Sequence, residues 1–399
     1  MSGATSYTFV KCLGRGGFGE VYLANRRNPE GIERRVAVKM LRSDLSDTDL
    51  AIARLKDEGK LLALLDHPGI VRVLELTRLG GQVALVTEYI DGIDLSRFCV
   101  SARRLPLKVV VSAIGEVAGA LDCAHTTVSP ETGKPLRLVH RDVKPENVRL
   151  SRHGEAKLLD FGIARSPEVS RQARTTTGNL PFTPGYTAPE AFVSLRQEPA
   201  TDVFALGATA FRLLVTERFY EGVRLAEQAS LSCAPARYGG YLEGRLYRLP
   251  PETGPEVTEL LRRCLAYDPG DRPTARQLMT KTEAMAEQME GPTLRRFVRE
   301  SPLPEERPIE DAPLIGRTLA EDRPGETVSF ERPVRGGRAS APTEVVSRSP
   351  QRSTEPAPTT TQTMWAFPWL VMGFSLLLAG GFAVVLAAIA FATGLWMGG

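Results

Sequence analysis

Residues 139–148 read VHRDVKPENV, and the tripeptide DFG follows at residues 160–162. The first stretch places Asp142, Lys144 and Asn147 close together, and Asp160 comes after a short intervening segment. Phosphoryl transfer needs an aligned hydroxyl group, neutralised phosphate oxygens and Mg²⁺ held by oxygen ligands. We therefore expect Asp142 to accept the proton of a hydroxyl group and Lys144 to screen the γ-phosphate. Asn147 and Asp160 are the expected metal ligands.

The two stretches resemble the catalytic loop and the metal-binding loop of bacterial eukaryotic-like (Hanks-type) Ser/Thr protein kinases. An isolated HRD tripeptide occurs by chance, but the full spacing followed by DFG is far more specific. The resemblance implies an α+β, bilobal protein kinase fold over residues 7–283, with a β-rich N-lobe at 7–90 and a helical C-lobe at 91–283. It also implies ATP and Mg²⁺ in the site and protein substrates that carry the accepting hydroxyl.

Composition bounds the remaining functions. The 42% hydrophobic content of the 399 residues supports a large core. The net charge of +3 and the lack of basic runs interleaved with aromatic residues argue against a nucleic-acid partner. Five cysteines without a Cys-x-x-Cys spacing favour buried, reduced thiols over disulfides or a zinc site. Residues 1–10 lack a secretory signal pattern, so we expect the kinase domain in the cytoplasm.

Residues 14–19 read GRGGFG between two segments with strand alternation, 7–13 and 20–24. Glycines there let backbone N–H groups approach phosphate oxygens. A simple turn and a dinucleotide site share this spacing. A dinucleotide site needs a helix directly after the glycines, whereas here the strand pattern at 20–24 follows directly and another lies at 36–39. By resemblance, this region lines the ATP site with Leu13, Gly14, Arg15, Gly16, Gly17, Phe18, Gly19, Glu20, Val21 and Ala37.

Lys39 resembles the strand lysine that pairs with the α- and β-phosphates. A helix predicted over residues 47–65 supplies its carboxylate partner, because Glu58 shares a face with Leu62 and Leu65. The rival carboxylate of Asp57 points about 100° away on such a helix. After this helix, a buried strand leads into the segment between the lobes. By resemblance, backbone groups of Glu88 and Ile90 meet the adenine edge, and Thr87 closes the back of the pocket.

Two places depart from the family pattern. Residues 126–138 contain proline, threonine and glycine, which predict a turn or small hairpin, interpreted as a surface elaboration rather than a partner site. Arg149 occupies the position where relatives place an apolar floor beneath adenine. We expect its methylenes to cover the ring while the guanidinium reaches solvent, or the guanidinium to stack on the base. Arg149→Leu is therefore expected to bind ATP as well or better.

The activation segment is expected at residues 162–190. Thr175, Thr176 and Thr177 are candidate phosphorylation sites, and a phosphate there can order the segment through arginines. The available arginines are Arg141, Arg165, Arg171 and Arg174. A flexible polar loop is the alternative interpretation. Thr183 resembles the threonine beside the catalytic residues of Ser/Thr kinases. Asp202 resembles the residue that fixes the catalytic-loop backbone, and Arg272 can pair with Glu190.

Residues 291–363 are rich in polar residues and proline without periodicity, which predicts a disordered linker. No charged residue occurs in 356–399, and 365–397 is apolar enough for one transmembrane helix with tryptophans near its ends. A buried soluble helix is the alternative. Arg348 and Arg352 before the span place the kinase side in the cytoplasm, so we expect a single-pass protein of the bacterial inner membrane. Small residues recurring every four positions in the span would allow a homodimer, although such residues are also common in any membrane helix.

Two other functions remain open from the sequence. A pseudokinase tethered to the membrane would act as a scaffold without turnover, and Arg149 is the feature that favours it. A kinase of small molecules could use the same fold, although the complete activation segment and Thr183 argue against it.

Overall fold

The computed structural model of the chain describes residues 4–16, 19–41, 48–100, 104–161, 183–194, 197–304, 309, 311–322 and 328–329. These residues all belong to one unit of the chain, which extends over residues 1–335.

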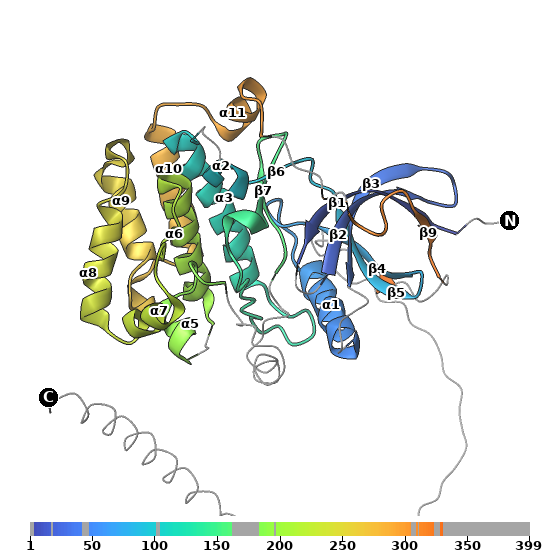
Figure 1. Ribbon diagram of the computed structural model, residues 1–399, viewed down its shortest axis with the longest axis horizontal. Helices are drawn as coiled ribbons and strands as arrows, with labels where there is room; N and C mark the ends of the chain where they lie inside the picture. Colours follow the sequence, from blue (N-terminus) through green and yellow to red (C-terminus); the bar gives the residue numbers. More distant parts are fainter. Residues whose placement is uncertain are drawn as a thin grey trace, which may run out of the picture. The chain divides into compact units, whose positions relative to one another are not determined.

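The N-lobe is a curled antiparallel sheet with one helix packed against it (Figure 1). Its strands are β1 (Ser6–Arg15), β2 (Gly19–Arg27), β3 (Glu33–Leu41), β4 (Val73–Leu79), β5 (Gln82–Glu88), β9 (Thr318–Ala320) and β10 (Val328–Ser329). They are hydrogen-bonded in the order β10-β4-β5-β3-β2-β1-β9. The helix is α1 (Thr48–Ala63).

Strand alternation separates the two faces of this sheet. In β3, Val36, Val38 and Met40 are buried on the outer face, where they join a core cluster. Ala37 and Lys39 point to the opposite face, because successive side chains of a strand alternate. That opposite face looks toward the C-lobe. The period of the sequence thus places Lys39 in the space between the lobes.

The C-lobe consists of helices and one small sheet. The helices are α2 (Ser96–Val100), α3 (Leu107–Thr126), α5 (Pro189–Ser194), α6 (Pro199–Val215), α7 (Leu225–Ser232), α8 (Pro235–Leu246), α9 (Gly254–Cys264), α10 (Ala275–Gln288) and α11 (Leu294–Glu300). Short 3₁₀ turns lie at Pro145–Asn147, Pro251–Thr253 and Pro269–Asp271. The sheet has the order β6 (Gly92–Asp94), β7 (Val148–Ser151), β8 (Ala156–Leu158).

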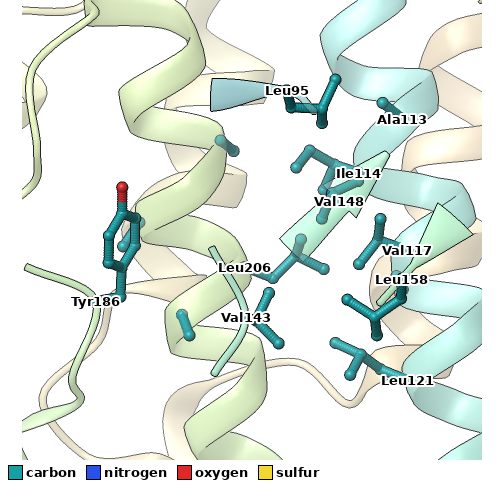
Figure 2. Packing of buried hydrophobic residues seen from close by; sticks show 14 of the residues in the cluster. Leu95, Ala113, Ile114, Val117, Leu121, Val143, Val148, Leu158, Tyr186 and Leu206 are labelled. Atoms are coloured by element: carbon teal, nitrogen blue, oxygen red, sulfur yellow. The ribbon is translucent and has the colours of Figure 1, made fainter. Parts of the chain in front are cut away.

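Helices α3 and α6 form the centre of the C-lobe core. Figure 2 shows Leu206 of α6 packed near Val117 and Leu121 of α3. Val143 and Val148, which flank the 3₁₀ turn of the catalytic loop, lie in the same cluster and are fully buried. The catalytic loop is therefore anchored at both ends in the largest hydrophobic core of the described residues.

The prediction of a disordered linker from residue 291 is wrong for its described part. Helix α11 packs on the C-lobe, where the Phe297 ring lies 6.1 Å from that of Phe98. The chain then reaches the N-lobe, where β9 pairs with β1 and β10 pairs with β4. One segment thus lines both edges of the curled sheet (Figure 1). The rest of 291–363 lies outside the described residues.

The outer face of the N-lobe sheet explains why this segment is ordered. It carries a buried cluster that includes Tyr7, Phe9 and Tyr22. This cluster contains Ala312, and Ile309, Leu314 and Leu319 pack against it. Covering apolar surface in this way is favourable, and it needs no periodic pattern in the covering segment. We call residues 309–322 the cover segment.

Smaller predictions have mixed outcomes. The predicted C-lobe limit at residue 283 falls inside α10, which continues to Gln288. The turn or hairpin over 126–138 is confirmed by a bridge between Val128 and Pro135. All five cysteines are free; Cys12, Cys99 and Cys264 are buried as expected, whereas Cys123 is half-buried and Cys233 is exposed.

The predicted transmembrane helix at 365–397 lies outside the described residues. Within the part of the chain that the structure describes, none of the helices combines the length and the apolar character needed to span a membrane.

Candidate active site

Asp202 of α6 fixes the backbone of the catalytic loop, as predicted. Its carboxylate is 1% exposed and accepts the N–H groups of His140 at 2.7 Å and Arg141 at 2.9 Å. Its Oδ2 also lies 2.9 Å from His125 Nε2. Arg141 has a φ of 70°, a left-handed conformation that costs energy in a residue with a side chain. The bonds to Asp202 hold that strained turn in place.

His140 is fully buried between the catalytic loop and the metal-binding loop. Its Nε2 lies 2.9 Å from the carbonyl oxygen of Leu159, and its Nδ1 lies 3.3 Å from the N–H of Asp142. Burial lowers the pKa of His140, so the ring is neutral. A neutral ring with the proton on Nε2 satisfies both contacts, because Nε2 then donates and Nδ1 accepts. His140 thereby links the loop of Asp142 to the residue before Asp160.

The carboxylate of Asp142 is held from three sides. Lys144 Nζ donates to Oδ2 at 2.8 Å, and Asn147 Nδ2 donates to the same oxygen at 3.0 Å. Thr183 Oγ1 donates to Oδ1 at 2.8 Å and lies 3.4 Å from Lys144 Nζ. The predicted grouping of Asp142, Lys144 and Thr183 is therefore present. Such an arrangement fixes a base and a cation beside the space that an incoming hydroxyl group needs.

Lys39, Glu58 and Asp160 form a charged cluster in the cleft between the lobes. Lys39 Nζ donates to Glu58 at 2.8 Å and to Asp160 Oδ1 at 3.0 Å. Burial opposes the charge on Lys39, but the carboxylates of Asp160 and Glu58 raise its pKa well above the usual range. The Lys39 ammonium in turn holds the pKa of Asp160 below its usual value. Helix α1 thus presents Glu58 to Lys39 as predicted. Lys39 and Asp160 both carry their charges.

The oxygen donors of Asn147 and Asp160 fit Mg²⁺. The N–H of Leu159 donates to the carbonyl oxygen of Asn147 at 2.8 Å, so the segments that carry the two expected metal ligands, Asn147 and Asp160, lie side by side. Asn147 directs its amide nitrogen to Asp142, which leaves the amide oxygen for another partner. Lys39 contacts only Oδ1 of the ionised Asp160 in the cluster described above. Mg²⁺ is commonly held by one or two such groups together with phosphate oxygens and water.

A cleft with an empty volume of about 830 Å³, part of it open to solvent, lies between the lobes. Of the residues predicted to bind ATP, Leu13, Gly14, Val21, Ala37, Lys39, Glu58, Thr87, Glu88 and Ile90 line it. Leu62, Val71, Leu85, Tyr89, Asp94, Glu146 and Leu159 also line it and were not predicted. Most of these are ordinary apolar core residues by sequence, so nothing in their local pattern marks them as pocket walls.

Of the described glycines in the glycine-rich turn, Gly14 lines the cleft, whereas Gly16 and Gly19 do not. Gly16 N–H donates to the carbonyl oxygen of Gly19 at 2.9 Å. A Cβ on Gly19 would lie 2.3 Å from the carbonyl oxygen of Met40, so only glycine lets β2 approach β3 there. Arg15 instead pairs with Glu20 at 2.7 Å and with the backbone of Asp311, and these two side chains do not line the cleft. Gly17 and Phe18 lie outside the described residues.

Arg149 does not reach solvent, so the expectation that its guanidinium would lie in solvent is wrong. The residue is 5% exposed, and its Nε donates to the carbonyl oxygen of Ile90 at 2.8 Å. Its guanidinium also donates to Asp94 Oδ1 at 2.8 Å. Arg149 and Asp94 face each other in the β6–β7 pair, and both line the cleft. The guanidinium is thus tied to the segment that joins the lobes.

The pairing of Glu190 with Arg272 is confirmed, with N–O distances of 2.7 and 2.8 Å. The Arg272 side chain is fully buried, and its planar fork matches the carboxylate in bidentate fashion. This pair fixes the end of the activation segment on the C-lobe. The candidate phosphorylation sites Thr175, Thr176 and Thr177 lie outside the described residues, as do Arg165, Arg171 and Arg174.

Comparison with known proteins agrees with this site. The model of the protein kinase domain family matches residues 7–282. The tyrosine-protein kinase MasK of Myxococcus xanthus is 32% identical over 291 residues, covering 71% of this chain and 44% of MasK. The Ser/Thr-protein kinase PkaB of Streptomyces coelicolor is 31% identical over 297 residues, covering 71% and 64%.

The Ser/Thr-protein kinase PknK of Mycobacterium tuberculosis is 35% identical over 269 residues, covering 66% of this chain and 22% of PknK. A solved structure of the PknI kinase domain of Mycobacterium tuberculosis covers 72% of this chain and 98% of its own, with 28% identity and a TM-score of 0.47. The chain spans less than two thirds of the length of each of the three curated relatives. Since the family model covers well over half of the 399 residues, the chain belongs to the protein kinase family.

Proposed function

We propose that the protein is a Ser/Thr protein kinase that transfers the γ-phosphate of ATP to hydroxyl groups of protein substrates. The observation that carries this proposal is the Asp142 carboxylate, held by Lys144, Asn147 and Thr183 beside the cleft. Asp142 takes the hydroxyl proton, while Lys144 lies beside it to offset charge on the transferred group. Mg²⁺ on Asn147 and Asp160 supplies charge neutralisation of the phosphates when bound.

Serine and threonine are the proposed acceptors because Thr183 lies against both Asp142 and Lys144. One relative is named a tyrosine-protein kinase and others are named Ser/Thr-protein kinases. The names of the relatives therefore leave the acceptor as a matter for experiment on this chain.

The direct test supplies γ-labelled ATP and Mg²⁺ to the full chain with a general acceptor protein, and identifies the phosphorylated amino acids after acid hydrolysis. We expect labelled phosphoserine or phosphothreonine, and no label with Lys39→Met, which removes the ammonium of the charged cluster. Phosphotyrosine alone would overturn the proposed acceptor. Saturable ATP binding without any transfer would favour the pseudokinase scaffold.

We also propose that residues 365–397 anchor the protein in the bacterial inner membrane as a single span, with the kinase domain in the cytoplasm. The support is compositional: 356–399 carries no charged residue, and arginines precede the span. In this arrangement Thr175, Thr176 and Thr177 are the proposed targets of autophosphorylation, and two tethered copies can form a homodimer that phosphorylates itself.

A further inference from the structure

Three acid–base pairs join the segment between the lobes to the β7–β8 hairpin. Lys157 pairs with Glu88 at 2.9 Å, Arg152 with Asp91 at 3.0 Å, and Arg149 with Asp94 at 2.8 Å. The acidic partners recur every three residues along one segment, and the basic partners come from one hairpin. The segment is therefore held against the C-lobe along its whole length.

The Arg149 pair differs from the Arg152 pair in burial and in place. The side chains of Arg152 and Asp91 are 65% and 52% exposed, and such surface ion pairs contribute little to the free energy of folding. The side chains of Arg149 and Asp94 are 7% and 28% exposed, and both residues line the cleft. Arg152 therefore offers a matched control with the same chemistry on the same hairpin.

Arg149 also bonds to the backbone of a residue that lines the cleft. Its Nε–H donates to the Ile90 carbonyl oxygen at 2.8 Å, and Ile90 lines the cleft. Hydrogen bonds from a charged donor are shorter and stronger than neutral ones. This carbonyl oxygen already accepts one hydrogen bond, so a ligand donor would have to share it with a buried guanidinium, whose positive charge disfavours a second N–H donor beside it.

The bond from Arg149 to the Ile90 carbonyl oxygen affects which purines the cleft can bind. Adenine presents in order the N6 amino donor, the N1 acceptor and the C2–H group. If Glu88 and Ile90 backbone groups meet N6 and N1, the next backbone group is the Ile90 carbonyl, which then lies opposite C2. A purine with an amino group at C2 could donate to that oxygen, whereas adenine has no donor there.

We propose that Arg149 is a positioning residue that determines base specificity: by engaging the Ile90 carbonyl, it makes the cleft favour adenine over purines with a 2-amino group. This inference rests on the proposed function, in which the cleft binds ATP. Arg149 also neutralises the carboxylate of Asp94 in the cleft. Replacing it by leucine removes this cation from beside the Asp94 carboxylate and leaves more negative charge close to a polyanionic ligand, which is unfavourable.

Arg149→Leu should therefore bind ATP more weakly than the wild type, by about tenfold, which is the effect of losing one buried charged hydrogen-bond partner. This reverses the expectation from sequence. The affinity for 2-amino-ATP should fall much less, because its amino group can now donate to the freed Ile90 carbonyl. The double variant Arg149→Leu/Asp94→Asn also removes the negative charge of Asp94, so it should recover most of the ATP affinity and keep the altered base preference.

The experiment measures the Kd of ATP and of 2-amino-ATP, each with Mg²⁺, by calorimetry on the full chain. The variants are the wild type, Arg149→Leu, the double variant and the control Arg152→Leu. We expect the ratio of the 2-amino-ATP Kd to the ATP Kd to fall at least about fivefold in both Arg149 variants, the size of one hydrogen bond. Arg152→Leu should change neither Kd by more than about twofold.

An unchanged ratio in Arg149→Leu would overturn the inference even if both affinities drop, because a purely structural role weakens both nucleotides alike. If Arg149→Leu does not fold, Arg149→Lys makes the same test, since an ammonium can pair with Asp94 but lacks the planar fork that reaches two acceptors. A wild type that binds neither nucleotide would instead refute the proposed function, so the two failures are distinguishable.

Discussion

At the scale of single residues, His140 makes the stability of the folded chain depend on pH. Burial lowers its pKa, and its neutral ring bridges Leu159 and Asp142. In the unfolded chain a histidine has a pKa near 6.5, so unfolding takes up a proton once the pH falls below about that value. The stability that the neutral ring contributes is therefore complete above about pH 6.5 and is lost as the pH falls toward the lower folded pKa.

The prediction is that the melting temperature of the wild type drops more between pH 7.5 and pH 5.5 than that of His140→Gln, which cannot be protonated. Calorimetry or circular dichroism at both pH values measures the two drops. His153→Gln is the control, because His153 is exposed. Equal drops in the wild type and His140→Gln would show that His140 does not contribute to the acid sensitivity.

Residue roles could be predicted where chemistry dictates spacing along the chain. Asp142, Lys144 and Asn147 lie within one short loop, so their grouping follows from the sequence. The partners of Arg149 could not be found this way. They are a backbone carbonyl and a carboxylate that are 59 and 55 positions away, and only the β6–β7 pairing brings them together.

At the scale of elements, the cover segment contributes to the stability of the N-lobe. Leu319 packs on the buried outer face of the sheet, whereas Ile315 in the same segment is 36% exposed. Leu319→Ala should lower the free energy of unfolding by roughly 1–2 kcal/mol, less than for a fully buried leucine. Ile315→Ala should change it by less than about 0.5 kcal/mol. Denaturant unfolding of both variants measures the difference.

Two further outcomes bear on the cover segment. A chain ending at residue 304 should melt at a lower temperature than one ending at residue 335, because it leaves the cluster around Tyr7 and Phe9 exposed. Identical melting of these two chains, or equal effects of the leucine and isoleucine replacements, would mean that the segment does not stabilise the sheet.

Long periodic elements such as α3 and the strands β1 to β3 follow from the sequence, because period and burial agree in them. The cover segment could not be predicted in this way. Its strand β9 has only three residues, and β10, which follows the segment, has only two, so neither is long enough to show an alternation. Its few apolar residues become meaningful only once the sheet face that they cover is known.

At the scale of the whole molecule, tethering is expected to control activation. Ala379, Ala383 and Ala387 recur every four residues in the proposed span, which allows two helices to approach closely. Two tethered kinase domains gain effective concentration for each other. The full chain in membranes should therefore phosphorylate its Thr175–Thr177 segment faster than a chain ending at residue 335 at the same concentration.

Mass spectrometry of the Thr175–Thr177 segment over time measures these rates. Ala383→Leu with Ala387→Leu in the membrane-embedded chain should abolish the advantage, because larger side chains keep the helices apart. The same rate for all three proteins would leave the span with an anchoring role alone.

We propose that Asp142 acts in phosphoryl transfer rather than in nucleotide binding. Its carboxylate is bound by Lys144, Asn147 and Thr183, whereas Lys39 and Glu58 line the cleft. A base that acts in the transition state contributes to turnover much more than to ground-state binding.

The decisive measurement compares the wild type with Asp142→Asn in two assays, the rate of γ-phosphate transfer to an acceptor protein and the Kd of ATP with Mg²⁺. We expect transfer to fall by at least about 10²-fold, as for the loss of a general base, while the Kd stays within about twofold. Undiminished transfer in Asp142→Asn would contradict the account.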